Sequence, residues 1–250
     1  MIVLIIGKER MMKKVKRFFL AGLLLVGATA AWAQDEIETT ISGDVVSSYI
    51  WRGQDLGDVS LQPTLGVSYK GLSLTAWGSV GLTDAFDTKE FDLTLSYTTG
   101  GLNIGITDYW FDAGLDPDAR YFKYDAHGTN HVFEANIGYD FGVASVQLFT
   151  NFAGNDGINK DGKRAYSSYA EVVVPFKLSA IDWTATVGAV PYATSFYNDW
   201  TSGFAVTNVS LKATKEIKVT DSFSIPVFGQ VVGNPCTQKA YLVFGFTLQP

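Results

Sequence analysis

The sequence predicts an all-β fold: a transmembrane antiparallel up-and-down β-barrel of about 12 strands. Three observations predict it, namely strands with one apolar face, links that alternate between short and long, and aromatic residues at both ends of the apolar face. The clearest stretch is 90–110, where apolar and polar residues alternate on both sides of Gly100-Gly101. Successive strand side chains point to opposite faces, and Gly accepts the positive φ of tight turns. We therefore expect a β-hairpin with one apolar face here.

The same alternation recurs along the chain. Most of the expected strands are near the ~9–11 residues that cross a bilayer when tilted. Pro63 and Pro226 fall inside two of them and each removes a ladder hydrogen bond, so a bulge or a shifted boundary is expected there. The twelve expected strands run roughly over 39–52, 60–70, 72–83, 89–99, 102–112, 131–141, 143–153, 165–176, 181–191, 203–214, 222–232 and 238–248.

The links between these strands alternate in length. Short, Gly-containing links follow the second, fourth and sixth strands, whereas the links after odd-numbered strands are mostly long and polar. Short turns on one side and long loops on the other are typical of outer-membrane barrels, and an even strand count puts both termini on the short-turn side. The long links span 53–59, 84–88, 113–130, 154–164 and 192–202.

Aromatic residues mark both ends of the apolar face, as expected where side chains meet lipid headgroups. Periodicity alone would also fit a soluble β-sandwich whose apolar face turns inward; the link pattern and the aromatic belts favour the membrane. The expected belt near the short turns consists of Tyr69, Tyr97, Tyr139, Phe141, Phe176, Trp183 and Phe223. The expected belt near the long loops consists of Tyr49, Trp51, Trp110, Phe152 and Tyr166.

Residues 1–33 read as a secretory signal peptide, with the mature barrel over 34–250. A basic segment over 12–17 precedes an apolar run over 18–30, and Ala31-Trp32-Ala33 forms a small-x-small cleavage site. The apolar run is shorter than the ~20 residues of a membrane-spanning helix. Residues 1–11 precede this signal, and we expect Met12 to be the true start.

The mature chain is acidic. Six of the 19 basic residues and one of the 25 acidic residues lie in 1–33, which leaves 13 basic and 24 acidic residues and a net charge of −11. Nucleic-acid binding is not expected, because it needs clusters of Lys and Arg. The single Cys236 excludes an intrachain disulfide. No phosphate-binding Gly loop and no Cys/His cluster is present, so no cofactor and no metal are expected.

The first mature third resembles the Gcw_chp family, also called the TorF-type porin family. The resemblance covers roughly residues 40–140 and depends mainly on Tyr49-x-x-Arg52-Gly53, followed by weaker matches at 62–63, 77–79, 90–92 and 133–139. It implies an outer-membrane location and a porin role. Nothing after about residue 145 adds to it.

Polar residues on the face opposite the apolar one are expected to line a lumen. Acidic groups outnumber basic ones there, and a charged constriction selects ions by sign, so a weak cation preference is expected. The alternative is that these charges pair with each other and plug the barrel. Arg52 is read either as a charge at the mouth or, preferably, as a buried ion-pair partner that fixes strand ends. The lumen candidates are Asp44, Arg52, Glu90, Asp92, Tyr109, Glu134, Glu171 and Asp182.

Twelve strands lie between the eight of a filled barrel and the sixteen of an aqueous channel. The leading functional prediction is passive diffusion of small hydrophilic solutes, with outer-membrane lipid and the barrel-assembly machinery as further partners. The alternative is a non-conducting structural, surface-anchor or adhesin barrel. A lipid hydrolase built around His131 is a third reading, but no motif marks a nucleophile, so no enzyme is expected. A metal site at His127 and His131, with Asp125 nearby, is an alternative to the absence of a metal, although these residues lie in a polar loop that runs into a strand. The long loop 113–130 is a candidate constriction.

Overall fold

The computed structural model describes residues 37–84, 86–113, 119–126, 128–198, 203–221 and 223–250. The chain divides into two units, 1–38 and 39–250, and the second unit forms the fold described below. The predicted signal peptide lies outside the described residues. Every regular secondary-structure element in the described ranges is a β-strand. Within those ranges, no helix has the length and apolar character needed to cross a membrane.

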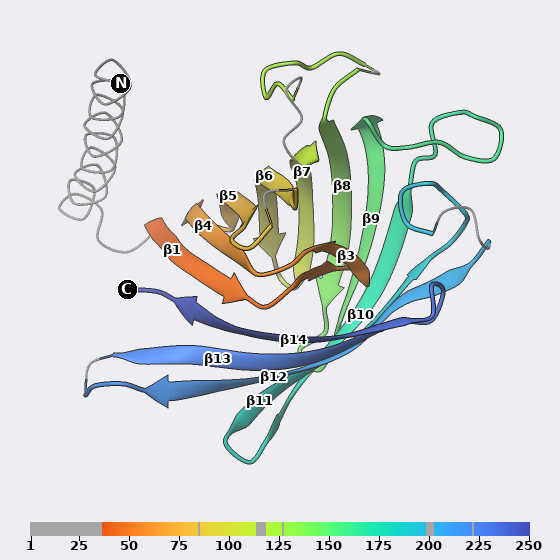
Figure 1. Ribbon diagram of the computed structural model, residues 1–250. Helices are drawn as coiled ribbons and strands as arrows, with labels where there is room; N and C mark the ends of the chain where they lie inside the picture. Colours follow the sequence, from red (N-terminus) through yellow and green to blue (C-terminus); the bar gives the residue numbers. More distant parts are fainter. Residues whose placement is uncertain (1–36, 85, 114–118, 127, 199–202, 222) are drawn as a thin grey trace, which may run out of the picture. The chain divides into compact units, whose positions relative to one another are not determined.

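Twelve of the fourteen strands in the described residues close into one antiparallel barrel, and β2 and β3 form a separate two-stranded sheet (Figure 1). The fold class predicted from the sequence is confirmed. The strands are β1 (Ile37–Val46), β2 (Tyr49–Trp51), β3 (Gln54–Gly57), β4 (Ser60–Tyr69), β5 (Leu72–Gly81), β6 (Thr88–Thr99), β7 (Leu102–Ala113), β8 (His131–Asp140), β9 (Ser145–Gly154), β10 (Ser168–Leu178), β11 (Ile181–Val190), β12 (Ala205–Lys218), β13 (Ser224–Asn234) and β14 (Lys239–Leu248).

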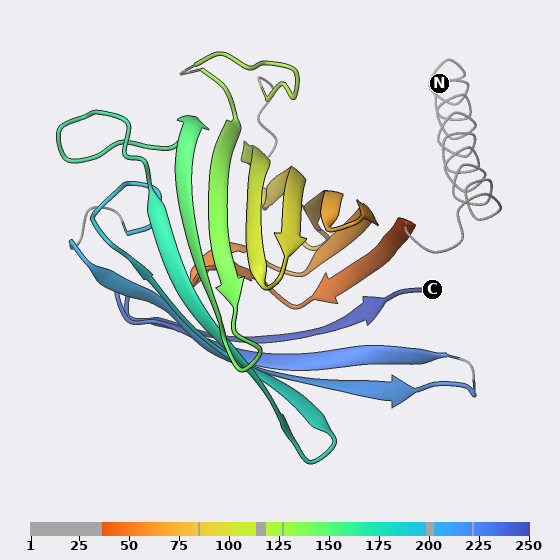
Figure 2. The same ribbon diagram turned by 180° about the vertical axis from the view of Figure 1, so that it is seen from behind.

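Each barrel strand pairs with its neighbours in the chain, and β1 pairs with β14 from Gly43↔Leu248 to Val46↔Gly245. Two-residue links join β4 to β5, β6 to β7, and β10 to β11, whereas long loops follow β7 and β9 at the other end of the barrel (Figure 2). The predicted alternation of links is therefore confirmed. The exception at the long-loop end is the short link between β13 and β14.

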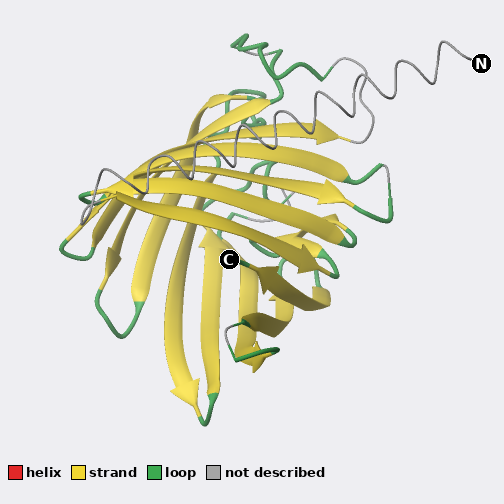
Figure 3. Cartoon of the chain, turned by 90° about the vertical axis from the view of Figure 1, so that its left-hand side faces the viewer, coloured by secondary structure: helices red, strands yellow, loops and turns green. Residues whose placement is uncertain are grey.

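The apolar face of the sheet points away from the barrel interior. Leu65, Leu148 and Leu242 are 57%, 50% and 59% exposed, although each lies in the middle of a strand. A soluble sandwich would bury these side chains, so that alternative is wrong. Figure 3 shows the strands running obliquely around a common interior. Aromatic side chains are exposed at the short-turn end, including Tyr69, Tyr139 and Phe176.

The prolines occupy positions where one hydrogen-bonded neighbour is missing, which is where a sheet tolerates them. Pro226 pairs with Glu216 of β12 but precedes the first pair between β13 and β14. At Pro63 the β4–β5 pairing skips two residues and resumes in the same register. The expected disturbance at Pro63 is therefore a local gap in the ladder and not a bulge.

The first predicted strand, 39–52, is wrong in its second half. The barrel strand β1 ends at Val46, and the chain then turns inward to form the β2–β3 hairpin. Tyr49 and Trp51, predicted to face lipid in the outer belt, instead pack inside the barrel against Trp77 and Tyr109. The physical reason is the contacts that this segment makes inside the barrel: the Tyr49 hydroxyl bonds to Glu90 and Arg52 pairs with Glu134, and an outward-facing strand would lose both. The predicted tenth strand, 203–214, ends too early, since β12 continues to Lys218.

Candidate functional site

The β2–β3 hairpin lies inside the barrel, because its residues contact strands on several sides of the lumen. Tyr49 contacts β5 and β6 through Trp77 and Glu90, and Arg52 contacts β8 through Glu134. At the tip, a Cβ on Gly53 would lie 1.8 Å from the backbone oxygen of Thr207 in β12. The hairpin therefore spans the interior of the barrel at its long-loop end.

Arg52 and Gly53 are the two turn residues of this hairpin, between the paired residues Trp51 and Gln54. Their φ angles are 50° and 82°, so both are left-handed, as a two-residue type I′ turn requires. Gly53 adopts this conformation without penalty and is small enough to press against β12. The left-handed backbone costs Arg52 on the order of 1–3 kcal/mol, which its side-chain contacts must offset.

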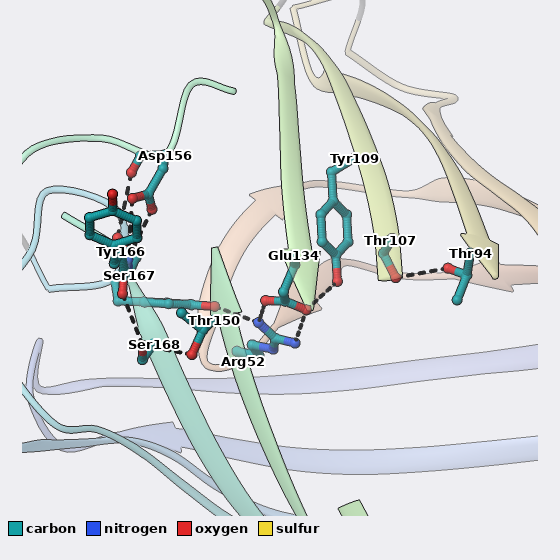
Figure 4. A network of polar contacts seen from close by, with 11 residues as sticks. Arg52, Thr94, Thr107, Tyr109, Glu134, Thr150, Asp156, Tyr166, Ser167 and Ser168 are labelled. Atoms are coloured by element: carbon teal, nitrogen blue, oxygen red, sulfur yellow. Dashed lines mark hydrogen bonds and ion pairs between the residues drawn. The ribbon is translucent and has the colours of Figure 1, made fainter. Parts of the chain in front are cut away.

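The guanidinium of Arg52 makes a bidentate ion pair with Glu134 of β8 (Figure 4). Arg52 Nη1 donates to Glu134 Oε2 over 2.5 Å and Nη2 donates to Oε1 over 2.9 Å. Two further groups complete the network: the Tyr109 hydroxyl donates to Glu134 Oε1 over 2.8 Å, and Arg52 also donates to the Tyr197 hydroxyl. Parallel charge-assisted hydrogen bonds are strong and fix orientation, so they lock the hairpin to the wall.

Aromatic rings surround the same guanidinium. The Cζ atom of Arg52 lies 4.0 Å from the ring centroid of Phe149, 4.4 Å from that of Trp51 and 4.8 Å from that of Tyr169. A cation over an aromatic face is attracted by the ring quadrupole, more strongly when water is excluded. Tyr197 stacks on Trp51 at a centroid distance of 6.0 Å. We call Trp51, Arg52, Tyr109, Glu134, Phe149, Tyr169 and Tyr197 the Arg52 cluster.

A second contact holds the base of the hairpin. The Tyr49 hydroxyl donates to Glu90 Oε2 over 2.8 Å, and the Glu90 carboxyl group lies within hydrogen-bonding reach of Asp92. Glu90 and Asp92 are two residues apart on β6, so both point into the lumen, as alternation requires. Among the described residues, Asp92 Oδ1 is buried without a hydrogen-bond partner. In the part of the chain that the structure describes, neither carboxyl group has an ion-pair partner, and the two interact with each other.

Five of the eight lumen candidates therefore gather around the hairpin: Arg52, Glu90, Asp92, Tyr109 and Glu134. The other three lie elsewhere. Asp44 accepts a hydrogen bond from Thr247 over 2.6 Å, at the seam between β1 and β14. Glu171 interacts with the Tyr169 side chain, and Asp182 pairs with Lys177 over 3.1 Å near the short-turn end.

Three aromatic members of the Arg52 cluster, Phe149, Tyr169 and Tyr197, were not among the residues predicted from the sequence. Phe149 and Tyr169 lie on the inward-facing side of β9 and β10, where most neighbouring side chains are polar. Aromatic residues on this side indicated that another segment packs against them inside the barrel. Tyr197 comes from the link between β11 and β12, whose inward course no local pattern shows.

The described part of the loop before β8, which includes Tyr121 and Tyr124, lies over the outer surface of the wall. His131 shares the outward parity of Trp110 and is fully buried beneath Tyr121 and Tyr124. Its Nδ1 is bonded to Asp108 Oδ1 over 2.7 Å and its Nε2 donates to the Tyr121 carbonyl over 2.5 Å. Both ring nitrogens are therefore occupied by groups other than a hydroxyl nucleophile. His127 lies outside the described residues, and no group of metal-binding side chains is found within them.

No family model and no curated protein matches this chain. Among solved structures it is similar to an outer membrane channel from Pseudomonas putida F1, at 12% identity and a TM-score of 0.40, covering 86% of this chain and 95% of that one. It is also similar to the translocator domain of the autotransporter NalP from Neisseria meningitidis, at 10% identity and a TM-score of 0.36, covering 94% and 96%. The fold class rests on the chain's own strand register and closure. The resemblance to the Gcw_chp family stays a prediction.

Proposed function

We propose that the mature chain is a bacterial outer-membrane β-barrel that passes small hydrophilic solutes through a lumen narrowed by the β2–β3 hairpin. The observation that supports it is the two-faced wall. Leucine, valine and isoleucine side chains are exposed around the outside, while carboxyl, amide and hydroxyl groups face inward. A closed β-barrel leaves no unpaired sheet edge, so it satisfies its backbone in lipid while keeping a polar interior. Export by the signal over 1–33 and insertion by the barrel-assembly machinery belong to the same proposal.

The charges at the narrow point favour cations. Arg52 is neutralised by its bidentate partner Glu134, so its field is largely cancelled. Glu90 and Asp92 lie side by side on the wall, and two buried carboxyl groups within hydrogen-bonding reach share a proton, so the pair carries about one negative charge. Field lines are focused by low-dielectric walls, so carboxyl groups at a constriction raise the local cation concentration. We therefore expect a weak cation preference.

The test is conductance of refolded mature protein in planar bilayers, followed by reversal potentials in a KCl gradient. Discrete conductance steps and a cation-selective reversal potential are expected. Anion selectivity would overturn the charge assignment and leave the channel in place.

A second function, a non-conducting structural or anchoring barrel, is favoured by one observation: the hairpin is locked to the wall by the Arg52 cluster. Replacing residues 48–58 with a short Gly/Ser linker separates the two functions. A silent wild type with a conducting deletion variant would identify the hairpin as a plug. Equal conductance of both proteins would show that the hairpin does not limit the pathway.

A further inference from the structure

A polar pocket of about 240 Å³ opens at the long-loop end of the barrel, beside the Arg52 cluster. Three segments form its walls: the hairpin with Gln54 and Asp55, the link before β12 with Ser195 and Phe196, and the start of β14 with Lys239. The pocket is not part of the ion-pair network. It shares only Tyr197 with the cluster, whose hydroxyl accepts a hydrogen bond from Arg52.

Hydrogen bonds hold the pocket walls in place. The Asn234 side-chain amide donates to the Gly53 carbonyl over 3.0 Å, and its oxygen accepts from the Thr237 N–H over 3.1 Å. Ser195 Oγ accepts from the Ile158 N–H over 3.0 Å, so the serine hydroxyl keeps its own hydrogen for another acceptor. A site whose groups are already ordered loses less entropy when a ligand binds.

Packing fixes the apolar part of the pocket in the same way. The Phe196 ring meets Tyr197 edge-on at a centroid distance of 5.0 Å and Trp51 at 6.2 Å. These contacts hold one aromatic surface beside the polar groups. A ligand with both C–H and O–H faces would use the two kinds of surface together.

The charge of the lining indicates a neutral ligand. One carboxylate, Asp55, and one ammonium group, Lys239, belong to different walls, and the remaining polar groups are amides and hydroxyls. A small anion would meet Asp55 and a small cation would meet Lys239, whereas a hydroxyl can donate to the first and accept from the second. The volume is below the roughly 300–1,000 Å³ of pockets for drug-sized ligands, so one small ring fits.

We propose that this mouth pocket binds a neutral monosaccharide, with sugar hydroxyls bonded to Asp55, Lys239 and Ser195 and the sugar C–H face against Phe196. This site goes beyond the proposed passage of solutes, because binding at the mouth does not need conduction. A barrel that fails to conduct can still bind the sugar, and a conducting barrel can lack the site.

The test uses refolded mature protein in detergent micelles and ligand-observed saturation-transfer NMR. D-glucose is the probe, with glycine and acetate as a zwitterionic and an anionic comparison. Saturable transfer to glucose is expected, with weak or no transfer to the two comparison solutes. The expected dissociation constant rises about tenfold in Asp55→Ala, since the lost partner is a charged hydrogen-bond acceptor. Lys239→Ala should weaken binding in the same direction.

The matched control is Asp221→Ala. Asp221 is an exposed residue of the link between β12 and β13, away from the pocket, and its carboxylate pairs with Lys218 at the end of β12. Heat-modified gel mobility confirms folding of each variant. The proposal is overturned if glucose gives no saturable transfer, if Asp55→Ala binds as well as wild type, or if acetate or glycine binds more tightly than glucose.

Discussion

Arg52 and Glu134 are 82 residues apart in the chain, yet Arg52 Nη1 lies 2.5 Å from Glu134 Oε2 inside the barrel. The pair connects the tip of an inward hairpin to the middle of the wall. Neither side chain reaches bulk water to any extent, because they are 7% and 2% exposed. A buried ion pair of this kind fixes the position of the hairpin on the wall. Its net contribution to the free energy of unfolding is small, because the cost of removing both charges from water offsets their attraction.

Arg52→Ala is expected to destabilise the folded barrel. It leaves Glu134 buried without its cation, and breaking one side of a buried ion pair costs about 3–5 kcal/mol. The measurement is urea unfolding in detergent, followed by heat-modified gel mobility. The double variant Arg52→Met with Glu134→Gln should recover most of this loss, since no buried charge remains. Equal stability of Arg52→Ala and wild type would contradict the structure of the pair.

Gly53→Ala is expected to displace the hairpin tip. Its φ is 82°, and the added Cβ would lie 1.8 Å from the Thr207 backbone oxygen. Gly100→Ala is the matched control, because Gly100 also has positive φ, 53°, but nothing lies within 4 Å of its Cβ position. Conductance in planar bilayers should rise for Gly53→Ala relative to Gly100→Ala. The same conductance for both variants would mean that the tip does not obstruct the lumen.

The wall of the barrel was predictable from the sequence and its contents were not. Period-two alternation and Gly-containing links determine strands locally, so residues such as Leu93 and Ile104 are assigned to the outer face from their neighbours alone. The hairpin depends on contacts between residues far apart, such as Tyr49 with Glu90. One local signal was present: the glycine of Arg52-Gly53 suits a left-handed turn. The assignment of Tyr49 and Trp51 to the lipid-facing belt hid this turn inside a predicted strand.

Glu90→Gln together with Asp92→Asn is expected to reduce cation preference. These two carboxyl groups lie beside the base of the hairpin and share a proton, so their replacement removes about one negative charge and weakens the negative potential of the lumen. The reversal potential in a KCl gradient should move toward zero, by more than for Asp221→Asn on an exposed turn. An unchanged reversal potential would assign selectivity to other groups.

Asp156, in the loop after β9, gives a prediction about pH. Burial raises the pKa of this carboxyl group, against hydrogen bonds from Ser167 that lower it. Because the pKa of Asp156 is higher in the folded loop than in the unfolded chain, the protonated carboxyl group stabilises the folded loop. This stabilisation is complete at pH values below the ordinary pKa of Asp, and it is lost as the pH rises through the pKa of the folded state. The Ser167 N–H donates to Asp156 Oδ1 over 3.0 Å, so its hydrogen-exchange protection reports this loop. Protection, corrected for intrinsic exchange, should fall with rising pH in wild type and less in Asp156→Asn.

Leu148 and Gln147 test which side of the wall meets lipid. They are adjacent on β9, and Leu148 is 50% exposed on the outer face, whereas Gln147 lies on the opposite, inward parity. An Arg on the lipid face near the bilayer midplane costs about 2–4 kcal/mol, while an Arg in a polar lumen has access to water. Leu148→Arg should therefore reduce refolding into lipid vesicles much more than Gln147→Arg, with a smaller difference in detergent. If Gln147→Arg is instead the more damaging change in vesicles, the outer face is not in contact with lipid and the membrane location is wrong.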